Sequence, residues 1–196
     1  MLTVQLPGFE NLTRDSQKTF RALLEALSLP GKTLEIEVTL KAPEGLTIAC
    51  AAACLTLMDL ETDVWLQPEI STDIRDWIQF HTGCVFVESP EKAAFAVIQN
   101  ADLLYLEQFY WGSAEKPEVS TTLLVQVNEL AGGMLVTLTG PGISHENIVS
   151  PKLHSHFWQQ WQQNHAAYPQ GIDVFLFKAR SVLGLPRSTY ARAEDR

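Results

Sequence analysis

Apolar residues recur at helical spacing in several stretches of the chain. Asp15 is positioned to cap the first helix and Pro30 to end it, and Ser71 is positioned to cap another. A stretch rich in Ala, Cys and Leu predicts a helix buried on all sides. The apolar stripes are Phe20, Leu23, Leu24 and Leu27 in the first helix and Ile74, Trp77 and Ile78 after Ser71; the other expected helices are 47–58, 102–110 and 153–164.

Other stretches have the two-residue period of a strand or are apolar throughout. Residues 33–40 alternate strictly, as expected of a strand with one wet face, antiparallel or at a sheet edge. Residues 172–177 are almost wholly apolar, which is typical of a central strand. Residues 121–127 and 134–139 flank Gly132-Gly133 and predict a hairpin. Shorter strands are expected at 63–67, 84–87 and 94–98, a loop at 112–120, and a polar, frayed tail after Thr189.

Helices and strands alternate through most of this pattern. The fold class is therefore expected to be α/β, with a mixed sheet flanked by helices. The 196 residues suit a single domain spanning 1–196, and no internal repeat or linker divides them. Hydrophobic residues make up 46% of the chain and charged residues 19%, which indicates a packed globular core.

Charge and compartment narrow the classes of function. The formal net charge of −9 repels a phosphate backbone, so no nucleic-acid partner is expected, although a local nest of N–H groups can still bind a small anion. No apolar run approaches the roughly 20 residues that cross a bilayer, and the N-terminus has no signal-peptide pattern. We therefore expect no membrane partner and a cytoplasmic protein. Cys50, Cys54 and Cys84 lie among apolar residues, which is typical of buried free thiols.

Complete catalytic signatures are absent from the sequence. It contains no phosphate-binding loop, no dinucleotide-binding glycine motif, no HExxH and no nucleophile elbow. His154 and His156 lie at an expected helix start, where side chains two residues apart diverge. Cys50 and Cys54 have no second pair at zinc-site spacing. The expectation is that there is neither a metal site nor a cofactor, and the catalytic residues stay unknown.

The remaining candidates are ligand or interface residues, each with a structural alternative. His81 continues an apolar stripe to the end of its helix, beside Thr82, and there it either caps carbonyls or meets a ligand or partner. Gly140 and Gly142 flank a proline, in a plain tight turn or an anion-binding nest.

Charged candidates form a second group. Arg187 near Thr189 can hold a phosphate or carboxylate in a bidentate manner, or can form a surface ion pair. Asp59 and Asp173 adjoin apolar segments, and Arg21 projects from the first helix. For these three residues, caps and ion pairs come ahead of catalysis as the expected role.

A series of short motifs runs in order from about residue 7 to residue 189. They are Pro7-Gly8-Phe9 with Asp15-Ser16-Gln17, the stretch 20–31, Leu55-Thr56-Leu57-Met58-Asp59, Thr62-Asp63-Val64-Trp65-Leu66, Phe80-His81-Thr82-Gly83, Ala94-Phe95-Ala96-Val97, Gly112 with Pro117 and Thr122-Leu123, Gly140-Pro141-Gly142-Ile143, Pro169-x-Gly171-Ile172-Asp173, and Gly184-x-Pro186-Arg187-x-Thr189. Each motif is weak alone, but in this order they resemble the PhnH family of the carbon–phosphorus lyase system. Thr121 and Leu27 depart from the pattern, where Ala and Met are more usual.

The resemblance implies a fold like that of the pyridoxal-phosphate (PLP)-dependent transferases, reduced and without PLP. It also implies a homodimer in isolation and a complex with PhnG, PhnI and PhnJ, with PhnL as a further partner. In the family, this system acts as an alpha-D-ribose 1-methylphosphonate 5-triphosphate synthase. It transfers an alkylphosphonate onto the ribose of ATP with loss of adenine, and PhnI is credited with the chemistry.

Three hypotheses follow from the residues and the resemblance together. The chain is a required but non-catalytic subunit of the synthase, with His81, Arg187 and the 112–120 loop facing a partner. Alternatively, it is a subunit that also binds substrate, through Arg187 and the turn at Gly140. The third hypothesis is an independent module that binds a phosphate, a phosphonate or a nucleotide in a closed pocket within one chain.

Overall fold

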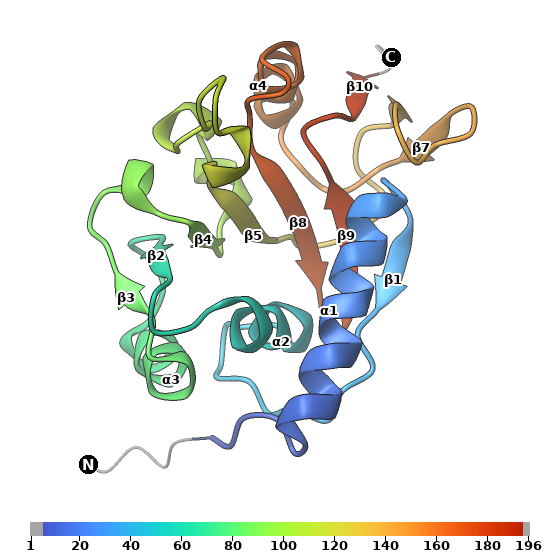
Figure 1. The fold of residues 1–196 in the computed structure, drawn as a ribbon. Coiled ribbons are helices and arrows are strands. Elements are labelled where there is room, and N and C mark those ends of the chain that lie inside the picture. Colours follow the sequence, from blue (N-terminus) through green and yellow to red (C-terminus); the bar gives the residue numbers. More distant parts are fainter. Residues whose placement is uncertain (1–5, 194–196) are drawn as a thin grey trace.

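The computed structural model describes residues 6–193, which form a central sheet with a layer on each face (Figure 1). The helices that cover one face are α1 (Leu12–Ser28), α2 (Ile48–Leu57) and α3 (Thr72–Thr82). The other face is covered by α4 (Ser155–Ala166) and by a small second sheet. The expected α/β class, with a mixed sheet flanked by helices, is confirmed. Within residues 6–193, no helix combines the length and the hydrophobicity that a membrane crossing requires.

The large sheet has seven strands in the order β1-β9-β8-β5-β4-β2-β3. Its strands are β1 (Thr33–Glu35), β2 (Asp63–Leu66), β3 (Val85–Phe86), β4 (Phe95–Ile98), β5 (Thr122–Gln126), β8 (Asp173–Lys178) and β9 (Ser181–Leu185). Strands β3, β2, β4, β5 and β8 run parallel, whereas β9 is antiparallel to both β8 and β1. The second sheet is antiparallel in the order β10-β6-β7, built from β6 (Val136–Thr139), β7 (Asn147–Val149) and β10 (Tyr190–Ala193).

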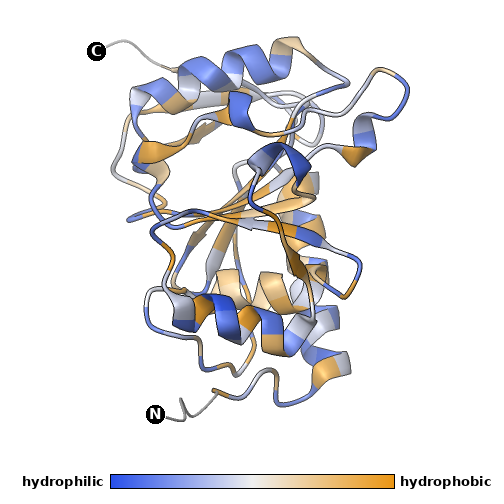
Figure 2. Cartoon of the chain, turned by 90° about the vertical axis from the view of Figure 1, so that its left-hand side faces the viewer, coloured by the Kyte–Doolittle hydropathy of each residue, from blue (hydrophilic) through white to orange (hydrophobic). Residues whose placement is uncertain are grey.

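Side chains that alternate along the parallel strands build two separate cores. Val97 and Leu124 pack with α1, α2 and α3, whereas Ala96 and Leu123, one position earlier in each strand, pack with α4 and the second sheet. Figure 2 shows the sheet as a largely hydrophobic layer between helices whose outer sides are hydrophilic. The apolar run in β8 therefore reads as predicted, because this strand lies between β5 and β9 with both faces covered.

Helix α2 confirms the prediction of a buried helix. Its residues 49–54 are fully buried, and the helix packs on α1, α3, β5 and β8 (Figure 1). Ala and Cys side chains are short, so the helix backbone lies close to all these neighbours. Thr47 caps its N-terminus by accepting a hydrogen bond from the Cys50 N–H (3.3 Å).

Helix α1 departs from the sequence prediction in its cap and in its buried face. Asn11 is the N-cap and accepts from the Arg14 N–H, while Asp15 accepts from the Asn11 N–H one turn later. Two members of the predicted stripe, Phe20 and Leu24, are exposed. Leu23 is buried and Leu27 packs against the core as predicted, but the buried face continues through Asp15, Thr19 and Ala26.

Close packing of α1 on β9 gives the physical reason for that shift. A Cβ at Gly184 would overlap the carbonyl oxygen of Ala26. The contact therefore selects the face with small side chains rather than the face with the largest ones.

Three other predictions are corrected. The stretches 121–127 and 134–139 do not form a hairpin, because β5 pairs in parallel with β4 and β8 while β6 belongs to the second sheet. The residues of 102–110 form two 3₁₀ turns, at Ala101–Leu103 and Leu106–Gln108, rather than one helix. The tail after Thr189 is not frayed where it is described, because β10 pairs with β6.

The alternating stretch 33–40 is confirmed as an edge segment, but its ladder is short. Strand β1 pairs antiparallel with β9 and ends at Glu35. Ile36, Val38 and Leu40 remain buried in alternation, as predicted. Beyond the ladder, the Arg180 guanidinium donates to the Val38 carbonyl (2.7 Å) and holds the extended chain in place.

Candidate ligand-binding site

The carboxyl ends of β2, β4, β5 and β8 meet at one edge of the large sheet because these strands run parallel. Polar residues lie at or directly beyond these ends: Gln67 after β2, Gln99 after β4, and Gln126 and Asn128 at the end of β5. In open α/β sheets, ligands bind in the crevice outside these ends.

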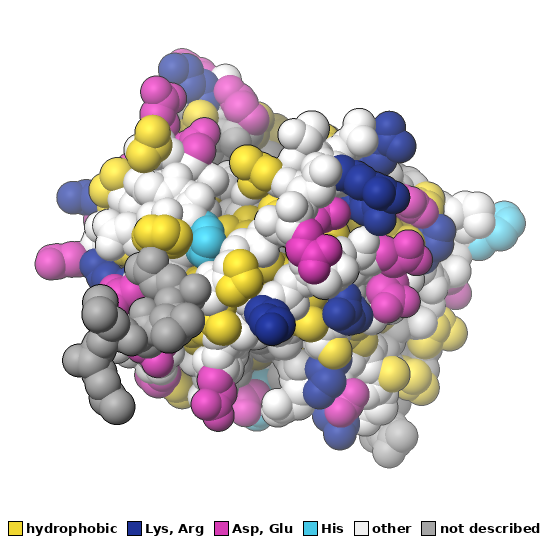
Figure 3. Space-filling view, turned by 90° about the horizontal axis from the view of Figure 1, so that it is seen from below, with side chains coloured by type: hydrophobic (Ala, Val, Ile, Leu, Met, Phe, Trp, Pro, Cys, Tyr) yellow, Lys and Arg dark blue, Asp and Glu magenta, His cyan; other side chains and the backbone are white. Residues whose placement is uncertain are grey.

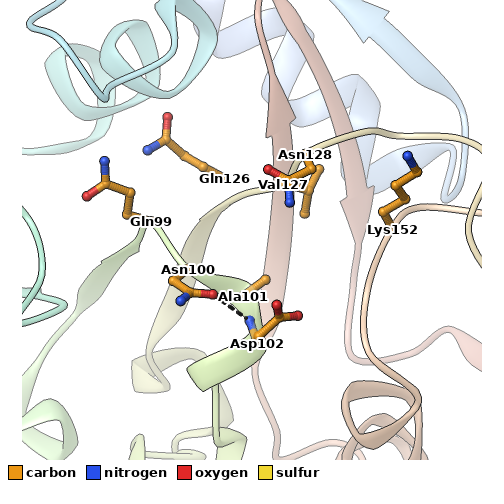
Figure 4. A pocket seen from close by; sticks show the side chains of 8 residues that line it. All are labelled: Gln99, Asn100, Ala101, Asp102, Gln126, Val127, Asn128 and Lys152. Carbon is orange, nitrogen blue, oxygen red and sulfur yellow. Dashed lines mark hydrogen bonds between the residues drawn. The ribbon is translucent and has the colours of Figure 1, made fainter.

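Two adjoining cavities lie at this edge. The first has a volume of about 320 Å³ and is lined by Gln99, Asn100, Ala101, Asp102, Gln126, Val127, Asn128 and Lys152 (Figure 4). The second, of about 390 Å³, is lined by Gly45, Thr47, Gln99, Gln126, Val127, Asn128, Lys178 and Ala179. They share four lining residues, and we call the pair the strand-end basin.

The buried amide of Gln67 holds the backbone of two residues that line the strand-end basin. Its Oε1 accepts hydrogen bonds from the backbone N–H groups of Gln99 (2.9 Å) and Asn100 (2.7 Å). Its Nε2 donates to the Asn100 carbonyl (3.0 Å). Three bonds from one buried side chain therefore set the turn that follows β4.

The segment that leads into α2 is tied across the strand ends by two further amides. Gln126 accepts from the Thr47 N–H (2.6 Å) and donates to the Gly45 carbonyl (2.9 Å). Gln99 Nε2 donates to the same carbonyl (3.1 Å). Gly45 has φ of 87°, and a Cβ there would lie 2.6 Å from Gln99 Nε2, so the position requires glycine. The wall between the two cavities is thus preorganised.

Charged groups at the rim remain available to a ligand. Within residues 6–193, the Lys152 ammonium and the Asp102 carboxylate make no hydrogen bond or ion pair. Lys178 lies 3.4 Å from Glu129, and both side chains are about half exposed. Figure 4 shows Lys152 on one side of the first cavity and Gln99 on the other, with Asp102 between them.

The Lys152 backbone is held from the loop after β5. Its N–H donates to the Glu129 carbonyl (2.9 Å), and the Gly133 N–H donates to the Ser150 carbonyl (2.7 Å). The glycines that suggested a hairpin turn therefore pair the 129–133 loop with residues 150–152. This pairing places a cation beside the strand-end basin.

Two sequence candidates, Asp173 and Arg187, lie together at the opposite end of the parallel strands. Arg187 Nε and Nη2 donate to the two oxygens of the Asp173 carboxylate (3.1 and 2.6 Å), and the Arg187 N–H donates to Oδ1 (2.8 Å). Arg187 Nη1 donates to the Pro117 carbonyl (2.6 Å). The guanidinium thus holds the 112–120 loop to the start of β8.

Thr189 follows Arg187 by two residues in the chain, and Gly140 lies against Ser188 and Thr189 in space. Thr189 is fully buried, its carbonyl accepts from Trp161 Nε1 (2.9 Å), and its hydroxyl has no partner in residues 6–193. A Cβ at Gly140 would lie 2.9 Å from the Ser188 carbonyl oxygen. Gly142 belongs to the same turn but packs on the Ser28 carbonyl at the end of α1. The predicted tight turn is confirmed, with the Ile143 N–H bonded to the Gly140 carbonyl (3.1 Å).

His81 and Thr82 lie elsewhere, at the end of α3. His81 Nε2 donates to the Leu6 carbonyl (2.9 Å), as Trp77 Nε1 does (3.0 Å). Thr82 donates to the Ile78 carbonyl (2.8 Å). His81 therefore faces inward, as its stripe predicted, and fastens the N-terminal segment to the helix.

The last two candidates, Asp59 and Arg21, are exposed. Asp59 accepts from the Thr62 hydroxyl (2.7 Å) and the Glu61 N–H (3.0 Å), and these bonds lower the pKa of its carboxyl. Arg21 lines a shallow cavity of about 270 Å³ on α1, together with Lys18, Glu25, Glu35 and Glu37. On the face seen in Figure 3, basic and acidic side chains are interspersed, so no single charge sign dominates there.

The sequence candidates therefore do not form one site, and the strand-end basin was missed. Its signal is the Gln or Asn that comes at or directly after each of three apolar strands. Within residues 6–193, no group of three or more His, Cys, Asp or Glu side chains is placed to hold a metal ion. The hydrogen bonds of His81 and His165 go to backbone carbonyls rather than to a nucleophile.

Fold and site together define an α/β domain with a polar strand-end basin and no nucleophile–base pair among its described histidines. A family model described as bacterial phosphonate metabolism protein (PhnH) matches residues 7–192. The chain is 36% identical over 190 residues to the alpha-D-ribose 1-methylphosphonate 5-triphosphate synthase subunit PhnH of Rhizobium meliloti, covering 95% of each. It is 30% identical over 177 residues to the putative C-P lyase subunit protein HtxG of Stutzerimonas stutzeri, covering 89% of this chain and 84% of that protein. The chain belongs to the PhnH family, as its motifs indicated.

Proposed function

We propose that this chain is a required subunit of a carbon–phosphorus lyase system, in the assembly that joins an alkylphosphonate to the ribose of ATP with loss of adenine. The observation that carries the proposal is the match to a synthase subunit over 95% of both chains. The match therefore extends over nearly the whole length of both proteins.

The internal use of its polar side chains supports a structural rather than a catalytic part. The Arg187 guanidinium donates its hydrogen bonds to Asp173 and to the Pro117 carbonyl, and His81 Nε2 donates to the Leu6 carbonyl. Chemistry at the anomeric carbon then belongs to a partner, PhnI in the family. PhnG and PhnJ, with PhnL as a further contact, complete the proposed cytoplasmic complex, and a homodimer is the proposed state of the isolated chain.

The proposal extends to the fold, which we propose resembles a reduced PLP-dependent transferase without PLP. In support, the large sheet contains five parallel strands, and the antiparallel strand β9 lies between β8 and β1. The seven lysines all lie in the described residues and none is buried; Lys178, which adjoins the strand-end basin, is 41% exposed. A Schiff base with PLP requires a lysine amine that is enclosed with its cofactor.

Gene deletion with complementation tests the subunit role. A strain that lacks this chain should fail to grow on methylphosphonate as the phosphorus source and should grow normally on phosphate. A tagged copy should restore growth and co-purify the partner subunits at fixed stoichiometry. Normal growth of the deletion strain on methylphosphonate would refute the role.

The strand-end basin favours a second candidate, an independent module that binds a small phosphate, phosphonate or nucleotide. This candidate predicts that the purified chain binds its ligand fully without any partner. It also predicts that the tagged copy purifies alone from cells grown on methylphosphonate.

A further inference from the structure

We propose that the strand-end basin binds an anionic sugar, a ligand that carries phosphate or phosphonate groups on a hydroxyl-bearing ring. That the sugar is a pentose rests on the function proposed above. The site itself, and its preference for a ligand that is both an anion and a polyol, rest on the geometry alone.

The first argument is preorganisation. Gln67, Gln126 and Gln99 make six hydrogen bonds to the backbone around the two cavities, at distances of 2.6 to 3.1 Å. Gln67 and Gln126 are 4% and 7% exposed, so the five bonds that they make are largely shielded from water, whereas the Gln99 bond to the Gly45 carbonyl is exposed. A wall that is already ordered loses little conformational entropy when a ligand binds.

The second argument concerns the anionic groups. Each cavity has one lysine on its rim, Lys152 on the first and Lys178 on the second, and the amides of Gln99 and Asn128 lie in the wall they share. Lys152 makes no ion pair within the described residues, and Lys178 makes one exposed ion pair with Glu129 (3.4 Å). A lysine on the rim of each cavity, with amides and the Asp102 carboxylate between them, suits a ligand with an anionic group at one or both ends of a neutral, hydroxyl-bearing ring.

The third argument concerns the hydroxyl groups. The Asp102 carboxylate and the Asn128 amide have no hydrogen-bond partner within residues 6–193. The Asn100 side chain accepts from the Asp102 N–H (3.1 Å) and does not contact the Asp102 carboxylate. A carboxylate accepts from the adjacent hydroxyls of a ribose ring, and an amide can donate and accept. Free inorganic phosphate leaves these groups unsatisfied and is repelled by Asp102. An apolar ligand would satisfy none of them.

Calorimetric titration of the purified full chain tests the inference with three probes: ribose 5-phosphate, ribose and inorganic phosphate. Ribose 5-phosphate should bind, and each of the other two should bind at least about tenfold more weakly, since each satisfies only half of the site. Equal affinity for inorganic phosphate and ribose 5-phosphate would overturn the inference, as would an absence of heat at millimolar ribose 5-phosphate.

Matched variants assign the contacts. Lys152→Met should weaken ribose 5-phosphate binding about tenfold, whereas Lys92→Met, which removes an exposed lysine outside the strand-end basin, should leave it unchanged. Asp102→Asn should weaken the binding of ribose 5-phosphate without weakening the binding of inorganic phosphate. Asp76→Asn, which removes an exposed carboxylate on α3, is its control. All four positions are exposed, so the melting temperatures should match that of the unmodified chain. Equal effects of Lys152→Met and Lys92→Met would overturn the assignment.

Co-purification of the partner subunits by Lys152→Met separates this inference from the proposed function. Normal assembly combined with loss of sugar phosphate binding would support both. Normal assembly by a chain that never binds the sugar phosphate would overturn the inference and leave the subunit role intact. Sugar phosphate binding by a chain that does not assemble would support the inference and overturn the subunit role.

Discussion

Replacement of Arg187 by alanine distinguishes a structural arginine from one that binds a ligand. The change removes two charge-assisted bonds to Asp173 and one to the Pro117 carbonyl. It leaves the Asp173 carboxylate with only the backbone N–H of residue 187. The 112–120 loop also loses its attachment to β8.

The expected cost follows from burial. The side chains of Arg187 and Asp173 are 13% and 21% exposed, so the pair is largely but not fully shielded. Removal of one partner of a buried pair costs about 3–5 kcal/mol. Partial exposure and the retained N–H bond reduce this to about 2–3 kcal/mol. In a chain of 196 residues that loss lowers the melting temperature by about 5–10 °C.

Urea unfolding followed by tryptophan fluorescence measures the effect. Arg187→Lys keeps a charge but loses the bidentate geometry, so it should recover less than half of the lost stability. In a double-mutant cycle, Asp173→Ala should cost much less in the Arg187→Ala background than in the unmodified chain. Arg192→Ala, at an exposed position of β10, is the control and should change stability by less than about 0.5 kcal/mol.

The reasoning fails if Arg187→Ala unfolds at the same urea concentration as the unmodified chain. If that variant were also to lose sugar phosphate binding or assembly, Arg187 would be a ligand or interface residue, as the sequence first suggested.

Three further predictions concern the interior. Asn164→Ala should lower the free energy of unfolding by about 3 kcal/mol, because this fully buried amide bonds both the Ile172 N–H (2.7 Å) and its carbonyl (3.0 Å); calorimetry should show no comparable loss for exposed Gln162→Ala on the same helix. The pKa of Cys54 is raised by its hydrogen bond with Cys50 and by burial, and that of Cys84 by burial, so a thiol reagent at pH 8 should label neither until urea unfolds the chain. Since these thiols ionise more readily in the unfolded chain, the free energy of unfolding should fall as pH rises above 9.0, the ordinary thiol pKa, and stability that increased there would contradict the sign.

Caps and apolar stripes, which are read from neighbouring residues in the sequence, predicted the helix whose packing partners accept its most apolar face. Ser71 caps α3 and the stripe Ile74, Trp77 and Ile78 is buried, because that helix rests on the core through its most apolar side. In α1 the same rule was right for Leu23 and Leu27 but wrong for Phe20 and Leu24, which are exposed. The contact with Gly184 on β9, far away in sequence, favours small residues, and no local pattern carries that information.

The pairing of the strands and the residues of the strand-end basin could not be predicted from local sequence patterns. A pair of glycines indicates that the chain turns, but β5 is apolar on both faces and so belongs in the centre of the sheet rather than in a hairpin. The residues of the strand-end basin come from segments near 45, 99, 127, 152 and 178. The parallel order of β4, β5 and β8 brings the strand ends together, and hydrogen bonds from those ends and from the 129–133 loop hold the segments near 45 and 152 beside them. By contrast, the family could be predicted from the sequence, because it is identified by the order of short motifs along the chain and needs no knowledge of which segments meet in space.

The two cores, one on each face of the central sheet, make the chain modular across its thickness. Substitutions such as those at Ile74 and Trp158 lie on opposite sides of a wall of strands and share no packing neighbour in the two clusters. Their effects on stability should therefore add, unlike those of neighbours within one core. An evolving member of this family can thus remodel one outer layer to suit a new partner while the opposite layer keeps its sequence.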